Sequence, residues 1–157
     1  MNIAVTGATG SIGRELIPFI KSLGHDVYII SSSIPSDGKL TFSYEDIKNN
    51  NICITVDIII HLASLNSNLD LDSMDQELQI TEDILSSLPG LKCKKLIFFS
   101  SAKVYGDNSM SDIIFDENSE LQPSCFYGEA KKRCEELISM QSVNSVSSVI
   151  FRLPPFL

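Results

Sequence analysis

Short hydrophobic runs alternate with amphipathic stretches along the chain of 157 residues. Runs rich in valine and isoleucine that stop at turn-forming residues predict strands buried in a sheet. Such runs occupy residues 2–6, 26–30, 56–62, 95–100 and 146–153, and a briefer one occupies residues 40–43.

Stretches with apolar residues three and four positions apart predict amphipathic helices. Two of them end at Gly24 and at Pro89-Gly90, residues that commonly terminate a helix. Pro18 lies inside the first helix, and its ring should disturb the turn back to Arg14 and kink the helix. The predicted helices are residues 11–23, 72–88 and 126–140, with one or two turns at 44–50, and turn-forming residues predict loops at 31–39 and 107–124.

The predicted strands and helices follow one another along the whole chain. This order indicates a parallel sheet with helices packed on both faces. We therefore predict an α/β protein with a doubly wound parallel sheet and three αβα layers, in which residues 1–157 form a single domain.

The chain is acidic, with 12 Lys and Arg against 20 Asp and Glu and a net charge of −8. That charge repels nucleic acids and anionic membranes, so we expect neither as a partner. No signal peptide or membrane-spanning run is recognisable at the expected length, which favours the cytoplasm. The cysteines form no CxxC pair and the chain has two histidines, so we expect free thiols and no metal site. The cysteines are Cys53, Cys93, Cys125 and Cys134.

A glycine-rich loop joins the first predicted strand to the first helix. Gly7 allows the sharp turn out of the strand, Gly10 allows a pyrophosphate to approach the backbone, and Gly13 allows close packing of the helix on the sheet. The amides that open the helix can then bind phosphate, aided by the helix dipole. The loop therefore predicts a dinucleotide site at Gly7, Thr9, Gly10, Ser11, Ile12 and Gly13.

Five stretches together resemble the extended short-chain dehydrogenase/reductases of the NAD-dependent epimerase/dehydratase family. In family order they are TGATGSIG at 6–13, DIIIHLAS at 57–64, FFSSAKVYG at 98–106, YGEAK at 127–131 and RLPPFL at 152–157. The resemblance covers essentially the whole chain and implies the Rossmann fold. It also implies that a C-terminal substrate domain is missing or truncated, so that the 157 residues alone should bind cofactor with reduced or absent turnover.

The same resemblance implies a catalytic set of Ser101, Tyr127 and Lys131. Tyr127 and Lys131 are four residues apart on one helix and share a face. A free phenol ionises near pH 10, and a neighbouring ammonium favours its phenolate form, which makes a usable general acid or base. By resemblance Lys131 also holds the nicotinamide ribose and Ser101 hydrogen-bonds the reacting oxygen, with Ser100 the less favoured serine. Glu135 is expected to pair with Lys131 at the surface.

The sequence leaves the choice between NAD and NADP open. An acid after the second strand would bind a ribose hydroxyl and an arginine a 2′-phosphate, but the residues there are Ser31, Ser32 and Ser33. Arg14 is a candidate for a phosphate contact, and the family slightly favours NAD. Leu62, Ala63 and Ser64 are expected to line the cofactor groove beyond the fourth strand, and His61 is expected to pack in the core.

The resemblance implies an oxidoreductase that acts on a nucleotide sugar by proton transfer through Tyr127 and hydride transfer to the cofactor, above all an epimerase. Lys103 replaces part of the acidic pair of the family's dehydratases, which weighs against dehydration. The alternatives are an NADPH-dependent carbonyl reductase and a non-catalytic dinucleotide-binding module, since the fold alone permits all three. A homodimer is compatible with the resemblance.

Overall fold

The computed structural model describes residues 1–31, 41–49, 54–65, 70–106, 114–141 and 146–154. All strands of these residues lie in one parallel sheet with the order β3-β2-β1-β4-β5-β6. The strands are β1 (Asn2–Thr6), β2 (Asp26–Ser31), β3 (Thr41–Ser43), β4 (Ile58–His61), β5 (Lys95–Ser101) and β6 (Ser147–Leu153).

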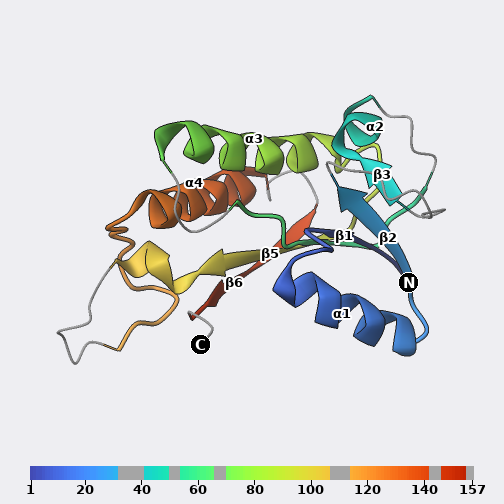
Figure 1. The fold of residues 1–157 in the computed structure, drawn as a ribbon, viewed down its shortest axis with the longest axis horizontal. Helices are drawn as coiled ribbons and strands as arrows, with labels where there is room; N and C mark the ends of the chain where they lie inside the picture. Colours follow the sequence, from blue (N-terminus) through green and yellow to red (C-terminus); the bar gives the residue numbers. More distant parts are fainter. Residues whose placement is uncertain (32–40, 50–53, 66–69, 107–113, 142–145, 155–157) are drawn as a thin grey trace.

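Helices cover both faces of the sheet, which confirms the three predicted layers (Figure 1). In the view of Figure 1, α3 and α4 lie above the sheet with α2 at their right, and α1 lies below. The helices are α1 (Ser11–Ser22), α2 (Tyr44–Lys48), α3 (Leu71–Ser87) and α4 (Phe126–Gln141), and a short 3-10 helix, η1 (Ala102–Tyr105), follows β5. None of the helices in the described ranges is long and apolar enough to cross a membrane.

Two hydrophobic clusters form because alternate residues of each strand point to opposite faces. On the face of α3 and α4, Ile59 and Phe98 pack against Ile84 and Cys134. On the other face, Ile3, Val5 and Ile60 pack against Ile20 of α1. The sheet is thus buried on both sides where α1 covers it, as expected for near-continuous apolar strands.

The observed elements follow the predicted ones closely, with differences at particular ends. The helix α1 runs unbroken through Pro18, and β2 includes Ser31, while residues 32–39 lie outside the described part of the chain. β4 is shorter than the predicted strand because Asp57 precedes it: the carboxylate accepts the Asn2 amide at 3.0 Å and the Lys94 ammonium at 3.1 Å. The helix η1 was not predicted.

The strand order brings the ends of β1 and β4 together, although 55 residues separate Thr6 from its neighbour His61. The Thr6 hydroxyl accepts the amides of Leu62 at 3.1 Å and Ala63 at 3.0 Å. Because both lone pairs are then used, its proton goes to Nδ1 of His61 at 2.7 Å. The other ring nitrogen, Nε2, then donates to Thr81 of α3 at 3.2 Å, so His61 links β1, β4 and α3 as a neutral ring.

Burial, with the charge of Lys131 as a second cause, lowers the pKa of His61 from 6.5 to about 3. The ring is therefore neutral in the folded protein and takes up a proton on unfolding once the pH falls below 6.5. We predict that the free energy of unfolding decreases by about 2 kcal/mol between roughly pH 7 and pH 5, measured by urea denaturation. Above this window the contribution of His61 is fully present.

His25 supplies the control, since it lies half-buried before β2 and outside this network. H61Q should lose most of the pH dependence, whatever its overall stability, and H25Q should keep it. An H61Q protein with the same pH dependence as the unchanged chain would contradict the assignment.

Candidate functional site

The glycine loop has the geometry that a pyrophosphate site requires. Gly7 has a φ of +68°, and a Cβ on it would lie 2.6 Å from the backbone nitrogen of Ala63. A Cβ on Gly13 would lie 2.5 Å from the carbonyl oxygen of Gly7. Both positions therefore exclude a side chain, and they hold the start of α1 directly against the ends of β1 and β4.

The N-terminus of α1 is open. Gly10 caps the helix without any side-chain hydrogen bond, and Thr9, Gly10 and Ser11 are exposed. The first amides of a helix carry unsatisfied hydrogen-bond donors and the positive end of its dipole. This cradle of glycines around free amides fits the pyrophosphate of a dinucleotide.

The other predicted cofactor residues lie at the same edge of the sheet. Leu62 and Ala63 are half-buried and follow β4, with Ser64 exposed after them. Ser31 ends β2 beside β1, where it pairs in register with Ser43 of β3. Ser32 lies outside the described residues. The fold thus brings Ser31, the glycine loop and residues 62–64 to one edge, at the point where the strand order reverses on either side of β1.

Ser101 and Tyr127 lie on neighbouring elements. Ser101 is the last residue of β5, and its Oγ accepts the Lys103 amide at 3.2 Å to cap η1. Gly128, next to Tyr127 in α4, is buried, and a Cβ on it would lie 2.5 Å from the carbonyl oxygen of Lys103. This close packing of α4 on η1 sets the position of Tyr127 relative to Ser101.

Lys131 is fully buried, with 1% of its side chain exposed. Its ammonium lies 4.9 Å from the centre of the Phe98 ring and 5.8 Å from the centre of the Tyr127 ring. It donates to Oε1 of Glu77 at 2.8 Å, and Glu77, on α3, is 2% exposed. This buried ion pair was not predicted from the sequence.

The predicted surface pair of Glu135 with Lys131 is wrong. Glu135 is buried and receives Arg152 of β6, with an Nη2 to Oε2 distance of 2.8 Å, and also the hydroxyl of Ser100. Arg152 in turn donates to the Tyr105 hydroxyl at 2.8 Å. Each carboxylate thus meets a cation from another element, because a buried charge requires a partner that faces it.

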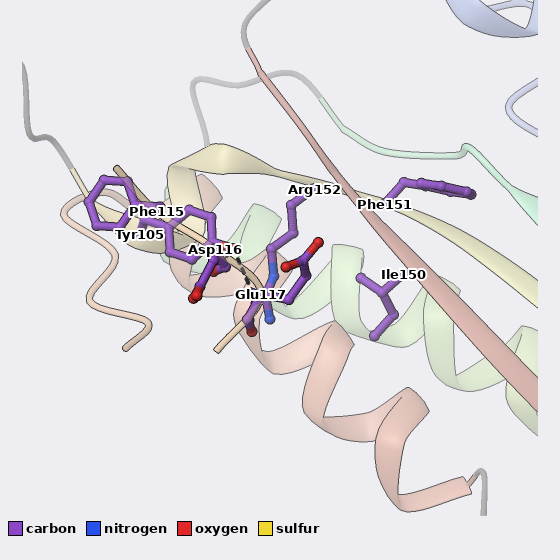
Figure 2. A pocket seen from close by; sticks show the side chains of 7 residues that line it. All are labelled: Tyr105, Phe115, Asp116, Glu117, Ile150, Phe151 and Arg152. Atoms are coloured by element: carbon purple, nitrogen blue, oxygen red, sulfur yellow. Dashed lines mark hydrogen bonds between the residues drawn. The ribbon is translucent and has the colours of Figure 1, made fainter. Parts of the chain in front are cut away.

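The residues around Arg152 also line a cleft of about 550 Å³. Figure 2 shows Arg152 directed toward Asp116 and Glu117, with the Tyr105 and Phe115 rings beside them. These two rings are stacked, with centres 4.7 Å apart, and the Tyr105 hydroxyl donates to the carbonyl oxygen of Asp116 at 2.8 Å. The contacts hold the segment that begins at residue 114 against η1. The lining of the cleft includes none of the predicted site residues.

Other buried groups near the site are held neutral. Burial raises the pKa of Tyr44 to about 12 and the pKa of the Cys134 thiol to about 11. Cys93, Cys125 and Cys134 are free thiols, whereas Cys53 lies outside the described residues. Within the described ranges, no group of three or more potential ligands could hold a metal ion.

Two residues of the site, Glu77 and Gly128, were not predicted, although the sequence pattern around each of them indicates its role. Glu77 falls on the buried stripe of α3, in step with Met74, Thr81, Ile84 and Leu88 at spacings of three and four. A carboxylate in such a stripe requires a buried partner. Gly128 lies within the predicted helix 126–140, where glycine is a poor helix former, and its presence there indicates close packing.

Comparison with known proteins agrees with these features. The UDP-glucose 4-epimerase of Halalkalibacterium halodurans is 26% identical over 154 residues, which cover 87% of this chain and 45% of the relative. A bifunctional UDP-glucose and UDP-xylose 4-epimerase of Arabidopsis thaliana is 27% identical over 163 residues, covering 87% and 46%. The chain thus spans about half the length of these relatives.

Solved structures share the fold. A UDP-N-acetylglucosamine 4-epimerase from Bacillus cereus superposes with a TM-score of 0.81 at 23% identity, covering 97% of this chain and 55% of that one. A UDP-glucuronic acid 4-epimerase from Bacillus cereus in complex with NAD gives 0.80 at 24% identity, covering 98% and 56%. The model of the NAD dependent epimerase/dehydratase family matches residues 3–156. The chain therefore belongs to the NAD-dependent epimerase/dehydratase family.

Proposed function

We propose that the chain binds NAD across the carboxyl ends of β1 and β4, and that the whole protein uses it to epimerise a nucleotide sugar. The observation that carries the proposal is the glycine cradle. Gly7 and Gly13 leave no room for a side chain, and they hold the open N-terminus of α1 at the reversal of the strand order. Relatives that are UDP-sugar epimerases support the substrate class.

NAD is preferred to NADP for two reasons. The solved UDP-glucuronic acid 4-epimerase with the same fold holds NAD. At the end of β2, Ser31 offers an uncharged hydroxyl at the place where an arginine would accommodate a 2′-phosphate.

When bound, NAD would supply a hydride acceptor that can return the hydride to the opposite face of the same sugar carbon, which inverts that centre. Tyr127 takes the proton of the reacting hydroxyl as hydride leaves the same carbon, and gives it back in the return step. Ser101 hydrogen-bonds the same oxygen and fixes its position. Lys131, on the same helix as Tyr127, would hold the ribose of the nicotinamide.

The cofactor half of the proposal is tested by G10A. Gly10 has a φ of −70°, which alanine adopts freely, and its Cβ would meet only the Gly7 oxygen at 3.3 Å. We therefore expect G10A to fold with less than about 1 kcal/mol of lost stability. The added methyl group stands where the pyrophosphate approaches, so the affinity for NAD, measured by calorimetry, should fall at least roughly tenfold.

Lys21, exposed in the last turn of α1, supplies the matched control. K21A changes the same helix far from its N-terminus and should leave the affinity for NAD unchanged. Equal affinities of G10A, K21A and the unchanged chain would exclude the glycine loop as the pyrophosphate site.

The catalytic half is tested in the whole protein with Y127F. Loss of the phenolic hydroxyl should abolish the interconversion of UDP-sugar epimers, a loss of at least roughly a hundredfold for a general acid or base, while NAD affinity stays unchanged. Product analysis by chromatography measures the first and calorimetry the second. Full turnover by Y127F would leave Tyr127 without a catalytic role.

An absorbance measurement during turnover of the whole protein separates an epimerase from a carbonyl reductase. Epimerisation returns the hydride to the sugar, so the near-ultraviolet absorbance of the reduced cofactor should stay constant while product accumulates. A steady loss of NADPH absorbance with a carbonyl substrate would favour the reductase instead.

A further inference from the structure

The carboxylate of Glu77 joins two parts of the proposed cofactor site. Its Oε1 receives the Lys131 ammonium at 2.8 Å, and its Oε2 receives the backbone amide of Leu65 at 2.7 Å. Leu65 directly follows the segment 62–64 at the edge of the cofactor groove. Glu77 thus links the end of β4 to α4, and each oxygen of its carboxylate has a donor.

The two side chains of this ion pair are almost inaccessible to solvent. The side chains of Lys131 and Glu77 are 1% and 2% exposed, and the Phe98 ring lies under the ammonium. Burying an ammonium among such groups carries a large free-energy cost unless an anion accompanies it. Among the described residues, Glu77 is the anion within reach of Lys131, because Glu135 is occupied by Arg152.

We propose that Glu77 is the counter-ion of Lys131, a positioning residue that holds the ammonium in place and balances its charge so that the site accepts the positively charged, oxidised nicotinamide. The proposal rests on the proposed binding of NAD. It assigns a role to a residue of α3 that lies outside the glycine loop and the tyrosine–lysine pair.

The charge balance has a measurable consequence. The nicotinamide ring is positive in NAD⁺ and neutral in NADH, so a net charge near Lys131 acts on the oxidised form alone. With Glu77 and Lys131 both charged, their effects on the ring largely cancel. Removal of one of the two charges leaves the other uncompensated in a medium of low dielectric constant, where its effect is large.

The experiment measures the affinities of the chain for NAD⁺ and NADH separately by calorimetry. E77Q leaves a net positive charge that repels the positive ring, and it should weaken the binding of NAD⁺ relative to NADH by roughly tenfold. K131M leaves a net negative charge and should shift the ratio in the opposite direction. The double variant E77Q/K131M is neutral again, and its ratio should return to within about twofold of the unchanged chain.

E135Q is the matched control, because it also removes a buried carboxylate from an ion pair in the same layer of helices. It should lower stability without changing the ratio of the two affinities. A purely structural role for Glu77 predicts that E77Q, like E135Q, affects both forms of the cofactor equally.

The outcomes separate the two proposals. If the unchanged chain binds neither NAD⁺ nor NADH, the proposed function fails and this inference fails with it. If both forms bind and the ratio is the same in E77Q, K131M and the unchanged chain, the counter-ion role alone is overturned. If E77Q does not fold, K131M is compared with the double variant E77Q/K131M instead. A shifted ratio of affinities in K131M that returns in the double variant supports the counter-ion role, and an unchanged ratio in both overturns it.

Discussion

The contact between the glycine loop and the end of β4 is the constraint on which the rest of the site depends. Gly7 lies so close to Ala63 that a Cβ has no room, and the Thr6 hydroxyl binds the two amides that follow β4. These contacts fix the carboxyl ends of β1 and β4 at one level, and α1 begins directly beside them. His61 hydrogen-bonds both Thr6 and Thr81, so the position of α3 also depends on this junction.

Much of this arrangement can be predicted from the sequence because it depends on local pattern. A strand buried on both faces gives an apolar run in the sequence, and a helix gives apolar residues three and four positions apart with a glycine or proline at the end. The glycine loop is recognisable because its glycines stand between a strand and a helix, which gives the motif its context. The start of β4 was less well predicted, since the apolar run predicts a strand from residue 56 and the sequence does not reveal the bonds of Asp57 to Asn2 and Lys94.

The charged contacts within the site depend on distant elements and escaped prediction for that reason. Lys131 and Glu135 are four residues apart on α4, a spacing that favours a surface ion pair of about 0.3–0.5 kcal/mol. Both side chains are instead buried, and leaving one of two buried charges unpaired costs about 3–5 kcal/mol. The ion pairs that form therefore depend on partners from other elements: Glu77 of α3 for Lys131, and Arg152 of β6 for Glu135. Neither partner is identifiable from spacing along the chain.

Contacts on either side of Lys131 fix the position of α4. Glu135 and Arg152 anchor the helix to β6 and, through Tyr105, to η1, while Gly128 brings the first turn against the carbonyl oxygen of Lys103. Between these anchors, Lys131 has little freedom to move, and its charge is met by Glu77 rather than by water. Lys131 is therefore preorganised, since the fold has already met the cost of ordering a long side chain. The ammonium of Lys131 is thus held in position before any cofactor binds, and its charge is balanced by Glu77 of the neighbouring helix α3.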